Sequence, residues 1–476
     1  MKILLINPPV PLTYYNREFY PSLSMLYLGS VLKKNGEEVK ILDFNTIKLG
    51  DSVNPQKIYE DILVDTVSTF QPALIGCGCL FSGNFPDVLK FSTLCKNRFK
   101  NIPIVIGGIH PTLYPYEILT NCSFIDWIIM GEGEDTIVQL VKTIKSNRSD
   151  FDKIEGFAYR KNGKIFANPK THFIENLDSI PFPAYELINL KDYYVDTSNW
   201  YNPKKFPINT SLPIITSRSC PNRCTFCSMY KVMGPGWRAR SPKNVVDEIE
   251  YLYNKYNHRH FSIMDDNFTL SKSHALEICN QIIKRKLNIQ FETPNGVAVT
   301  TLDKELLDAM VSAGLVRISL AIESGSDFIR NQIMLKHLSS KKIYEIARLT
   351  KKYKQLYVKA FFIIGLPEET KETLADTYDM IKKINVDRAH VSNIVPFPGT
   401  KLFKQALRDN LLVDIDPNDL YKSEEFYSTN RNRFFIKPYN MDLRDLYEFR
   451  AKFEDLITKQ RRKNEILRKK SNNLRS

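Results

Sequence analysis

Two successive series of buried strands and amphipathic helices limit what this chain can fold into. In the first series, over residues 1–150, apolar runs at 2–7, 38–44, 73–80, 102–107 and 125–130 alternate with helical patterns. Alternating strands and helices favour a parallel sheet, because parallel strands need a crossover helix between them. We therefore predict an α/β, Rossmann-like, doubly wound domain that binds ligands beyond the carboxyl ends of its strands.

The second series, over residues 211–405, contains six strand–helix repeats. Its strands are expected at 214–216, 260–265, 289–293, 316–323, 357–364 and 388–395. Six repeats predict a partial (β/α)6 TIM-type barrel whose chemistry lies at the carboxyl-terminal mouth. Residues 151–210 form a connector with a hairpin at 157–166, and residues 406–476 form a helical C-terminal extension that ends in a basic tail.

Three cysteines follow the first strand of the second series. Cys220, Cys224 and Cys227 are spaced C-x3-C-x2-C. Thiolates are soft ligands, and three of them on a four-iron cluster would leave one iron open. A closed zinc site would need a fourth ligand, for which His258 and His260 are the candidates. Three ordinary reduced cysteines are the remaining alternative.

Cysteine usage and charge restrict the class of protein. The eight cysteines form no paired framework outside the motif, which favours a reducing compartment. No apolar run approaches the ~20 residues of a membrane span, and the N-terminus is too quickly broken by proline for a signal peptide, so we expect a cytoplasmic protein. The formal charge is +14, and part of the excess lies in the last 20 or so residues. That tail is either a solvated helix or a peripheral membrane contact, and without interleaved aromatic residues nucleic acid is not expected.

The cysteine spacing, with Phe226 directly before the third cysteine, resembles the cluster loop of the radical S-adenosylmethionine (SAM) superfamily. The resemblance implies a [4Fe–4S] cluster held by the three catalytic cysteines, with SAM on the open iron. It also implies contacts from the ends of later strands. The matching positions are Asp266 and Asn267 for the methionyl amine, Glu323 for the ribose, and Gly365 and Phe226 for the adenine. For each polar position, capping of the next helix is the alternative.

The strand ends of the first series resemble the cobalamin-binding domain that is attached to one large radical SAM class. The resemblance rests on Asn7-Pro8-Pro9, on the Gly-Gly-x-His-Pro-Thr loop at 107–112 and on the Gly-Glu-Gly-Glu turn at 131–134. It implies that the slot for the nucleotide tail is lined by Ser82, Gly107, Gly108, Gly131 and Gly133. Residues 8–20 contain no histidine, so we predict a cobalt without a histidine lower ligand, facing Tyr14 or Tyr15. A flavodoxin-like module that binds nothing is the alternative.

Together, the two resemblances imply an enzyme that forms a 5′-deoxyadenosyl radical from SAM. With methylcobalamin it would methylate an unactivated carbon of a small-molecule, lipid or tetrapyrrole substrate, and an electron donor such as flavodoxin or ferredoxin would be its partner. One alternative is a cobalamin-dependent radical cyclase or rearrangement enzyme without methyl transfer. An alternative of another class is a non-catalytic cobalamin- or nucleic-acid-binding sensor. The intact cysteine triad argues against the sensor, since a pure binder needs no open iron.

Overall fold

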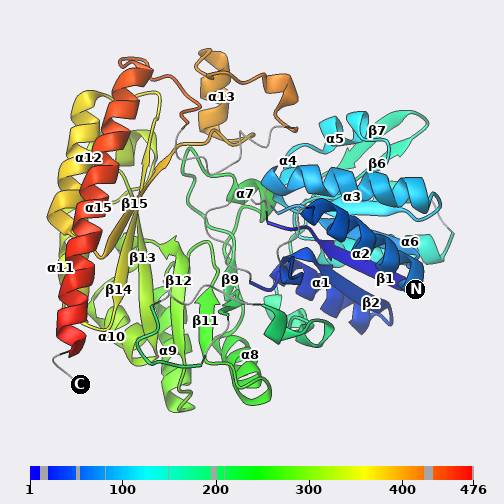
Figure 1. The fold of residues 1–476 in the computed structure, drawn as a ribbon, viewed down its shortest axis with the longest axis horizontal. Coiled ribbons are helices and arrows are strands. Elements are labelled where there is room, and N and C mark those ends of the chain that lie inside the picture. Colours follow the sequence, from blue (N-terminus) through cyan, green and yellow to red (C-terminus); the bar gives the residue numbers. More distant parts are fainter. Residues whose placement is uncertain are drawn as a thin grey trace. The chain divides into compact units, whose positions relative to one another are not determined.

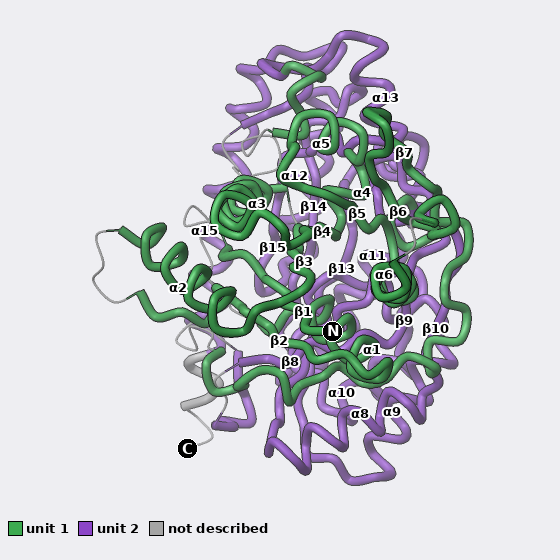
Figure 2. The backbone as a smooth tube through the Cα atoms, turned by 90° about the vertical axis from the view of Figure 1, so that its right-hand side faces the viewer, with its two compact units in different colours: residues 1–196, 231–234, 416–429 green, residues 197–230, 235–415, 430–476 purple. Residues whose placement is uncertain are grey.

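The computed structural model describes residues 1–10, 20–49, 54–80, 82–147, 150–193, 201–207, 210–422 and 433–473. The chain divides into two compact units (Figure 2). Unit 1 comprises Met1–Asp196, Lys231–Gly234 and Asp416–Thr429, and unit 2 comprises Thr197–Tyr230, Pro235–Ile415 and Asn430–Ser476. Each unit contains a sheet built mainly of parallel strands, which confirms the predicted fold class.

Unit 1 is built on a seven-stranded sheet in the order β2-β1-β3-β4-β5-β6-β7. Its strands are β1 (Lys2–Asn7), β2 (Glu38–Asp43), β3 (Leu74–Gly78), β4 (Ile104–Gly107), β5 (Trp127–Ile129), β6 (Phe157–Lys161) and β7 (Lys164–Asn168). Its helices are α1 (Leu23–Lys34), α2 (Pro55–Phe70), α3 (Phe85–Arg98), α4 (Ile109–Leu113), α5 (Pro115–Asn121) and α6 (Glu134–Lys145). The first five strands are parallel, and the order reverses at β1, so the ligand crevice of such a sheet is expected at the ends of β1 and β3.

The hairpin that we placed in the connector belongs to this sheet. Strand β6 pairs antiparallel with β5, and β7 pairs antiparallel with β6. The rings of Trp127, Phe151, Phe157 and Tyr159 pack together at this edge with neighbouring centroids 5.5–6.3 Å apart, which explains why the hairpin stays with unit 1. The unit therefore continues past residue 150, the boundary expected from the sequence.

Unit 2 contains six parallel strands in the order β15-β14-β13-β12-β11-β8, as in a partial barrel (Figure 1). The strands are β8 (Leu212–Ile214), β11 (His260–Ile263), β12 (Gln290–Val297), β13 (Leu315–Glu323), β14 (Tyr357–Ile364) and β15 (Arg388–Asn393). The helices are α8 (Pro242–Lys255), α9 (Lys272–Lys284), α10 (Lys304–Ser312), α11 (Ser340–Thr350), α12 (Lys371–Ile384) and α13 (Lys401–Arg408). Because all neighbouring strands of this sheet are parallel, the six strands bring their carboxyl ends to one edge.

The C-terminal helix α15 (Leu443–Asn473) packs along β15 and α12 (Figure 1). Arg450 donates to the Val391 carbonyl over 2.5 Å, and Arg468 binds both carboxylate oxygens of Asp387 over 2.6 Å. The basic helix that we expected to be solvated is therefore tied to the barrel through Arg468. Ahead of this helix, Leu412 and Ile436 form a single antiparallel bridge.

Among the described residues, every helix is either too short or too polar to cross a lipid bilayer.

Candidate active site

The three cysteines lie on a loop that leaves the carboxyl end of β8. A two-stranded ribbon closes the base of this loop, with β9 (Ser217–Arg218) antiparallel to β10 (Arg238–Ala239). Cys224 is buried, whereas Cys220 and Cys227 are partly exposed. The loop therefore presents its thiols at the carboxyl edge of the sheet, where the barrel topology predicts chemistry.

Asp265 fixes the start of the cysteine loop. This carboxylate, only 2% exposed, accepts from the Thr216 amide over 2.6 Å, from the Thr216 hydroxyl over 2.5 Å and from the Ser217 hydroxyl over 2.6 Å. Burial raises its pKa, and the three donors oppose that rise. Asp265 thus ties the end of β8 to the end of β11, and it has no oxygen to spare for a ligand.

The middle of the cysteine loop is held from two other directions. The Thr225 amide donates to the Met334 carbonyl over 3.3 Å, and its hydroxyl donates to the Ile333 carbonyl over 3.0 Å. The Leu402 amide donates to the Thr225 carbonyl over 3.0 Å. Because Thr225 lies between the second and third cysteines, these bonds set the position of both thiols.

The thiols share one electrostatic environment. Burial raises the pKa of all three, that of Cys227 to about 11. Each thiol is affected by other charges of the group, and the Lys336 ammonium opposes the rise at Cys220 and Cys224. A cation beside the thiols favours the thiolate, which is the form that binds metal.

Within the ranges that the structure describes, no three His, Cys, Asp or Glu side chains are gathered closely enough to bind one metal ion. His260 begins β11 and lies beside Glu292, while the cysteine loop follows the opposite end of the neighbouring parallel strand. Nε2 of His258 donates to the His260 carbonyl over 2.7 Å. Neither histidine can complete a zinc site with this loop. Three cysteines that each bind a different iron fit a cluster better.

Asp266 and Asn267 were both predicted to contact the methionyl amine, but their side chains lie in different surroundings. The carboxylate of Asp266 accepts the Ser219 amide and acts on the pKa of Cys220 and Cys227, so it faces the cysteine loop. The oxygen of Asn267, in a side chain only 4% exposed, accepts the Ala298 amide over 3.4 Å. Of these two residues, therefore, only Asp266 lies next to the thiols, and it has a carboxylate oxygen free for a ligand.

Capping is carried out by other residues. The side chains that accept from the first turn of helices α8 to α13 are those of Ser241, Ser271, Asp303, Ser339, Thr370 and Thr400. Asp266, Asn267 and Glu323 cap none of these helices. For these three positions the capping alternative does not hold, which leaves loop bridging or ligand contact.

Glu323 ends β13 in a left-handed conformation with φ of 72° and pairs with Lys336 over 2.8 Å. The two side chains are 9% and 15% exposed. The pKa of Lys336 is raised because the Glu323 carboxylate and two thiols outweigh the effect of burial. Nothing in the sequence pattern singles out Lys336. It lies in an irregular loop 13 residues after Glu323, and no periodicity marks it.

Gly365 follows β14 with φ of 97°, and its amide donates to Glu369 over 2.5 Å. A Cβ there would lie 2.9 Å from the ring of Phe434, so the protein's own packing requires the glycine. Phe226 packs against the buried cluster of Ile329, Met334 and Leu366, the last of which directly follows Gly365. Burial raises the pKa of Glu369 to about 8, against the two amides that it accepts. The predicted adenine-side residues therefore do lie together.

In unit 1, the predicted cobalamin residues lie at the carboxyl ends of β3, β4 and β5. Gly108 has φ of 121°, and a Cβ there would lie 2.4 Å from the Cys79 carbonyl. Thr112 accepts the Gly131 amide over 3.0 Å and donates to the Gly108 carbonyl over 2.7 Å. Gly107 differs, because a Cβ would meet nothing closer than 3.5 Å. The chain's own packing does not demand a glycine there, as expected where a ligand must approach the backbone.

Ser82 and His110 form a pair at the same edge, with the serine oxygen 2.8 Å from Nδ1 of the imidazole. His110 is 1% exposed between the rings of Phe85 and Tyr114, and burial lowers its pKa to about 3. It is held as a neutral side chain inside the unit rather than offered to a metal. Tyr14 and Tyr15, the predicted neighbours of the cobalt, lie outside the described residues.

Comparison with known proteins identifies both domains. Residues 214–381 match the radical SAM superfamily, and residues 17–141 match the B12 binding domain. An uncharacterized methyltransferase of Pyrococcus horikoshii is 30% identical over 449 residues, 92% of each chain. An anaerobic magnesium-protoporphyrin IX monomethyl ester cyclase of Cereibacter sphaeroides is 31% identical over 83% of this chain and 61% of its own length.

Among solved structures, the fold is similar to that of the radical S-adenosylmethionine methyltransferase TsrM from Kitasatospora setae. The form with tryptophan and a SAM analogue bound has a TM-score of 0.70 at 18% identity, covering 86% of this chain and 76% of that one. The same enzyme has been solved with cobalamin and a [4Fe–4S] cluster bound. The chain therefore belongs to the radical SAM superfamily, in the class that carries a B12-binding domain.

Proposed function

We propose that this chain is a cobalamin-dependent radical SAM methyltransferase that methylates a carbon of a small-molecule substrate. The observation that carries the proposal is the group formed by three thiols, Asp266, Glu323 and Lys336 at the carboxyl edge of one sheet. It supplies ligands for a cluster and, beside them, two carboxylates and an ammonium. SAM carries the complementary groups, an ammonium, a carboxylate and a ribose diol.

Cys220, Cys224 and Cys227 would hold the [4Fe–4S] cluster, with the loop fixed by Asp265 and Thr225. With its cofactors bound, the enzyme would draw on the cluster for an electron that cleaves SAM and on cobalamin for a methyl group. The chain's part is to orient both and to exclude water from the radical.

The polar residues around the thiols each suit one part of SAM. Asp266 would accept from the methionyl ammonium, and Lys336 would bind the carboxylate. Glu323 would accept the two ribose hydroxyls once the ligand carboxylate draws Lys336 away from it. Phe226 and Gly365 would face the adenine, while Asn267 bridges the loops behind Asp266.

Cobalamin would lie at the strand ends of unit 1. Gly107 would let the ligand approach the backbone, because the chain's own packing does not demand a glycine there. Gly108, Gly131 and Gly133 would shape the turns around the nucleotide tail, and Ser82 would contact it. No described histidine of unit 1 is placed as a lower ligand of cobalt, so we propose a cobalt without one.

The ranges 1–150, 151–210, 211–405 and 406–476 are proposed as cobalamin domain, connector, barrel and extension. The hairpin lies in the connector range, but its strands form the edge of the sheet in the proposed cobalamin domain. The partners would be the substrate and an electron donor such as flavodoxin or ferredoxin. A peripheral membrane contact by the tail would have to use charges of α15 other than Arg468, which binds Asp387.

A radical cyclase is the second candidate, favoured by the similarity to a named cyclase over 83% of this chain. The first experiment uses protein that is purified anaerobically and supplied with iron, sulfide, cobalamin, SAM and a reductant. We expect release of 5′-deoxyadenosine by the wild type and none by Cys224→Ala, and equal release by both would refute the assignment. With a substrate in hand, SAM that carries a labelled methyl group separates the two candidates, since only methylation moves the label into product.

A further inference from the structure

The segment that follows Glu323, residues 324–339, has an unusual backbone, and we call it the return loop. It contains a π-helical turn at Ile329–Ile333, in which the Met334 amide donates to the Ile329 carbonyl over 2.9 Å. Leu335 and His337, on either side of Lys336, both have positive φ, of 58° and 53°. Left-handed non-glycine residues and π turns are unfavourable and persist only where the surroundings hold them.

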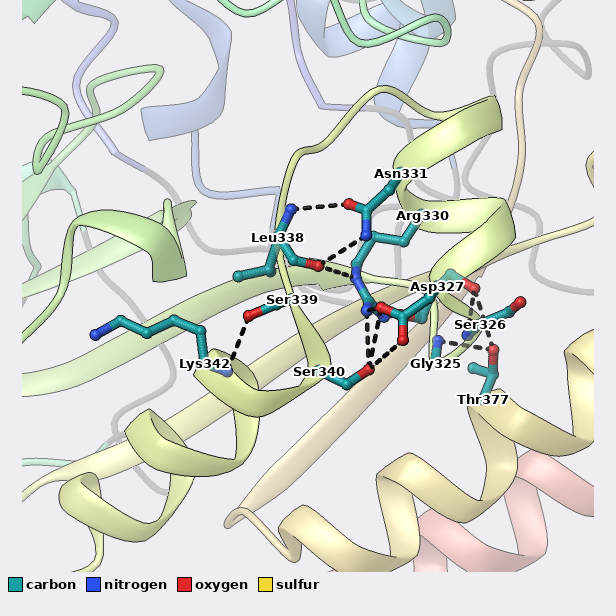
Figure 3. A network of polar contacts seen from close by, with 11 residues as sticks. Gly325, Ser326, Asp327, Arg330, Asn331, Leu338, Ser339, Ser340, Lys342 and Thr377 are labelled. Atoms are coloured by element: carbon teal, nitrogen blue, oxygen red, sulfur yellow. Dashed lines mark hydrogen bonds and ion pairs between the residues drawn. The ribbon is translucent and has the colours of Figure 1, made fainter.

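Arg330 holds the return loop from inside (Figure 3). Its side chain is completely buried. Nε donates to the Leu338 carbonyl over 2.7 Å, and Nη1 donates to the Ser324 carbonyl over 2.5 Å. Nη2 donates to the Ser340 hydroxyl over 2.9 Å and pairs with Asp327. One guanidinium therefore joins the start, the middle and the end of the loop.

The neighbours of Arg330 complete the same cross-link. Asn331 donates to the Leu338 carbonyl over 3.1 Å and accepts the Leu338 amide over 2.8 Å (Figure 3). The Lys336 amide donates to the Arg330 carbonyl over 3.0 Å. At the start of the loop, the Gly325 amide donates to the Thr377 hydroxyl of α12 over 2.9 Å. Together these bonds fix the conformation of the backbone at Lys336.

The return loop carries part of the candidate active site. It delivers the Lys336 ammonium to 2.8 Å from Glu323 and into electrostatic contact with Cys220 and Cys224. The carbonyls of Ile333 and Met334, on the same loop, accept the hydroxyl and the amide of Thr225. Two separate features of the site, the cation and the cysteine loop, therefore depend on one piece of backbone.

We propose that Arg330 is a positioning residue for SAM binding, which acts by fixing the return loop so that Lys336 and the cysteine loop keep their geometry. The inference rests on the proposed function, since it assumes that SAM is bound beside Lys336. Arg330 itself touches neither thiol, cluster nor ligand. Its effect should therefore appear in SAM affinity and become smaller when Lys336 is absent, since only the effect on the cysteine loop then remains.

The test uses reconstituted, cobalamin-loaded protein and measures the Kd of SAM by calorimetry, together with the change that SAM causes in the electron paramagnetic resonance spectrum of the reduced cluster. Arg330→Gln should raise the SAM Kd at least 10-fold and weaken the spectral change, with the Kd of cobalamin altered less than 2-fold. Wild-type protein whose spectrum does not respond to SAM would refute the proposed function itself, separately from this inference.

Arg450 offers a matched control in the same unit. It is 6% exposed and donates to the Val391 carbonyl, but it serves α15 rather than the return loop. Arg450→Gln should lower the melting temperature as Arg330→Gln does, with the SAM Kd changed less than 2-fold. Equal effects of both variants on the SAM Kd would mean that Arg330 is merely structural, and the inference would be overturned.

Two further variants keep the test decisive if Arg330→Gln does not fold. Asp327→Asn removes the charge of an exposed partner of Arg330 and should raise the SAM Kd about 2- to 5-fold, whereas an unchanged Kd would contradict the inference. Combined with Lys336→Met, either variant should add less than its own single effect, because part of that effect acts through the Lys336 ammonium. Full additivity would count against the inference.

Discussion

Asp266 should make the cluster-free protein less stable at neutral pH. Burial and the neighbouring Asp265 raise its pKa from 3.8 to about 6, although the Ser219 amide lowers it. The shift of about 2 units corresponds to roughly 3 kcal/mol at 1.36 kcal/mol per unit, and solvent at this partly exposed side chain reduces it to about 2 kcal/mol. Asp266→Asn, which keeps the shape and loses the charge, should therefore stabilise the reduced, cluster-free protein by about 2 kcal/mol at pH 7.5.

The raised pKa of Asp266 determines how the stability gain in Asp266→Asn depends on pH. A carboxyl whose pKa is raised by folding binds its proton more tightly in the folded state, so its contribution to stability improves as pH falls from above 6 toward 3.8. The gain from Asp266→Asn should be complete above pH 6 and absent at pH 3 and below, where the wild-type carboxyl is protonated in both states. A gain of about 2 kcal/mol corresponds to roughly 4–8 °C in the melting temperature of a domain of this size.

Scanning calorimetry at several pH values measures this directly, and Asp265→Asn is the neighbouring control. One oxygen of Asp265 accepts two hydroxyl donors, so Asp265→Asn should lower the free energy of unfolding by about 1–3 kcal/mol. The same Asp266→Asn variant should bind SAM more weakly, as expected if a destabilising charge is retained for function. A loss of stability in Asp266→Asn at pH 7.5, or a gain that persists in full at pH 3, would contradict the raised pKa of Asp266.

Three other changes test the packing around the two sites. Lys336→Met leaves the buried Glu323 carboxylate without its cation and should cost about 3–5 kcal/mol by calorimetry, and a neutral result would contradict the ion pair. Tyr193→Phe removes the 2.8 Å hydrogen bond to buried Asp43 and should destabilise unit 1 by about 1–3 kcal/mol in urea, with the transition of unit 2 unmoved. Arg468→Ala should speed amide exchange in the last turns of α15, and unchanged protection there would show that the helix end does not need its anchor.

Strand–helix alternation was enough to predict both parallel sheets, because a parallel strand needs a crossover and each crossover leaves a helical pattern in the sequence. It was not enough to place the hairpin. The Asn162-Gly163 turn showed that β6 and β7 exist, but the aromatic packing against Trp127 that joins them to unit 1 involves residues some 30 positions apart. Such contacts leave no periodic signal.

The candidate active site likewise contains residues that the sequence predicted and one that it did not. Spacing predicted Cys220, Cys224 and Cys227, and the end of a strand marked Asp266. Lys336 was invisible, since it reaches the thiols through a π turn and two left-handed residues that Arg330 holds from inside. A buried arginine in an irregular loop looks like any other charge in the sequence.

The central claim is that SAM and cobalamin act together in this chain. The most direct test incubates the anaerobically reconstituted protein with reductant and SAM that carries an isotope-labelled methyl group, and then analyses the bound cobalamin and the released nucleosides by mass spectrometry. The account predicts labelled methyl on the cobalamin and 5′-deoxyadenosine in solution, with the deoxyadenosine lost in Cys224→Ala. Consumption of SAM with no label on the cobalamin would contradict it.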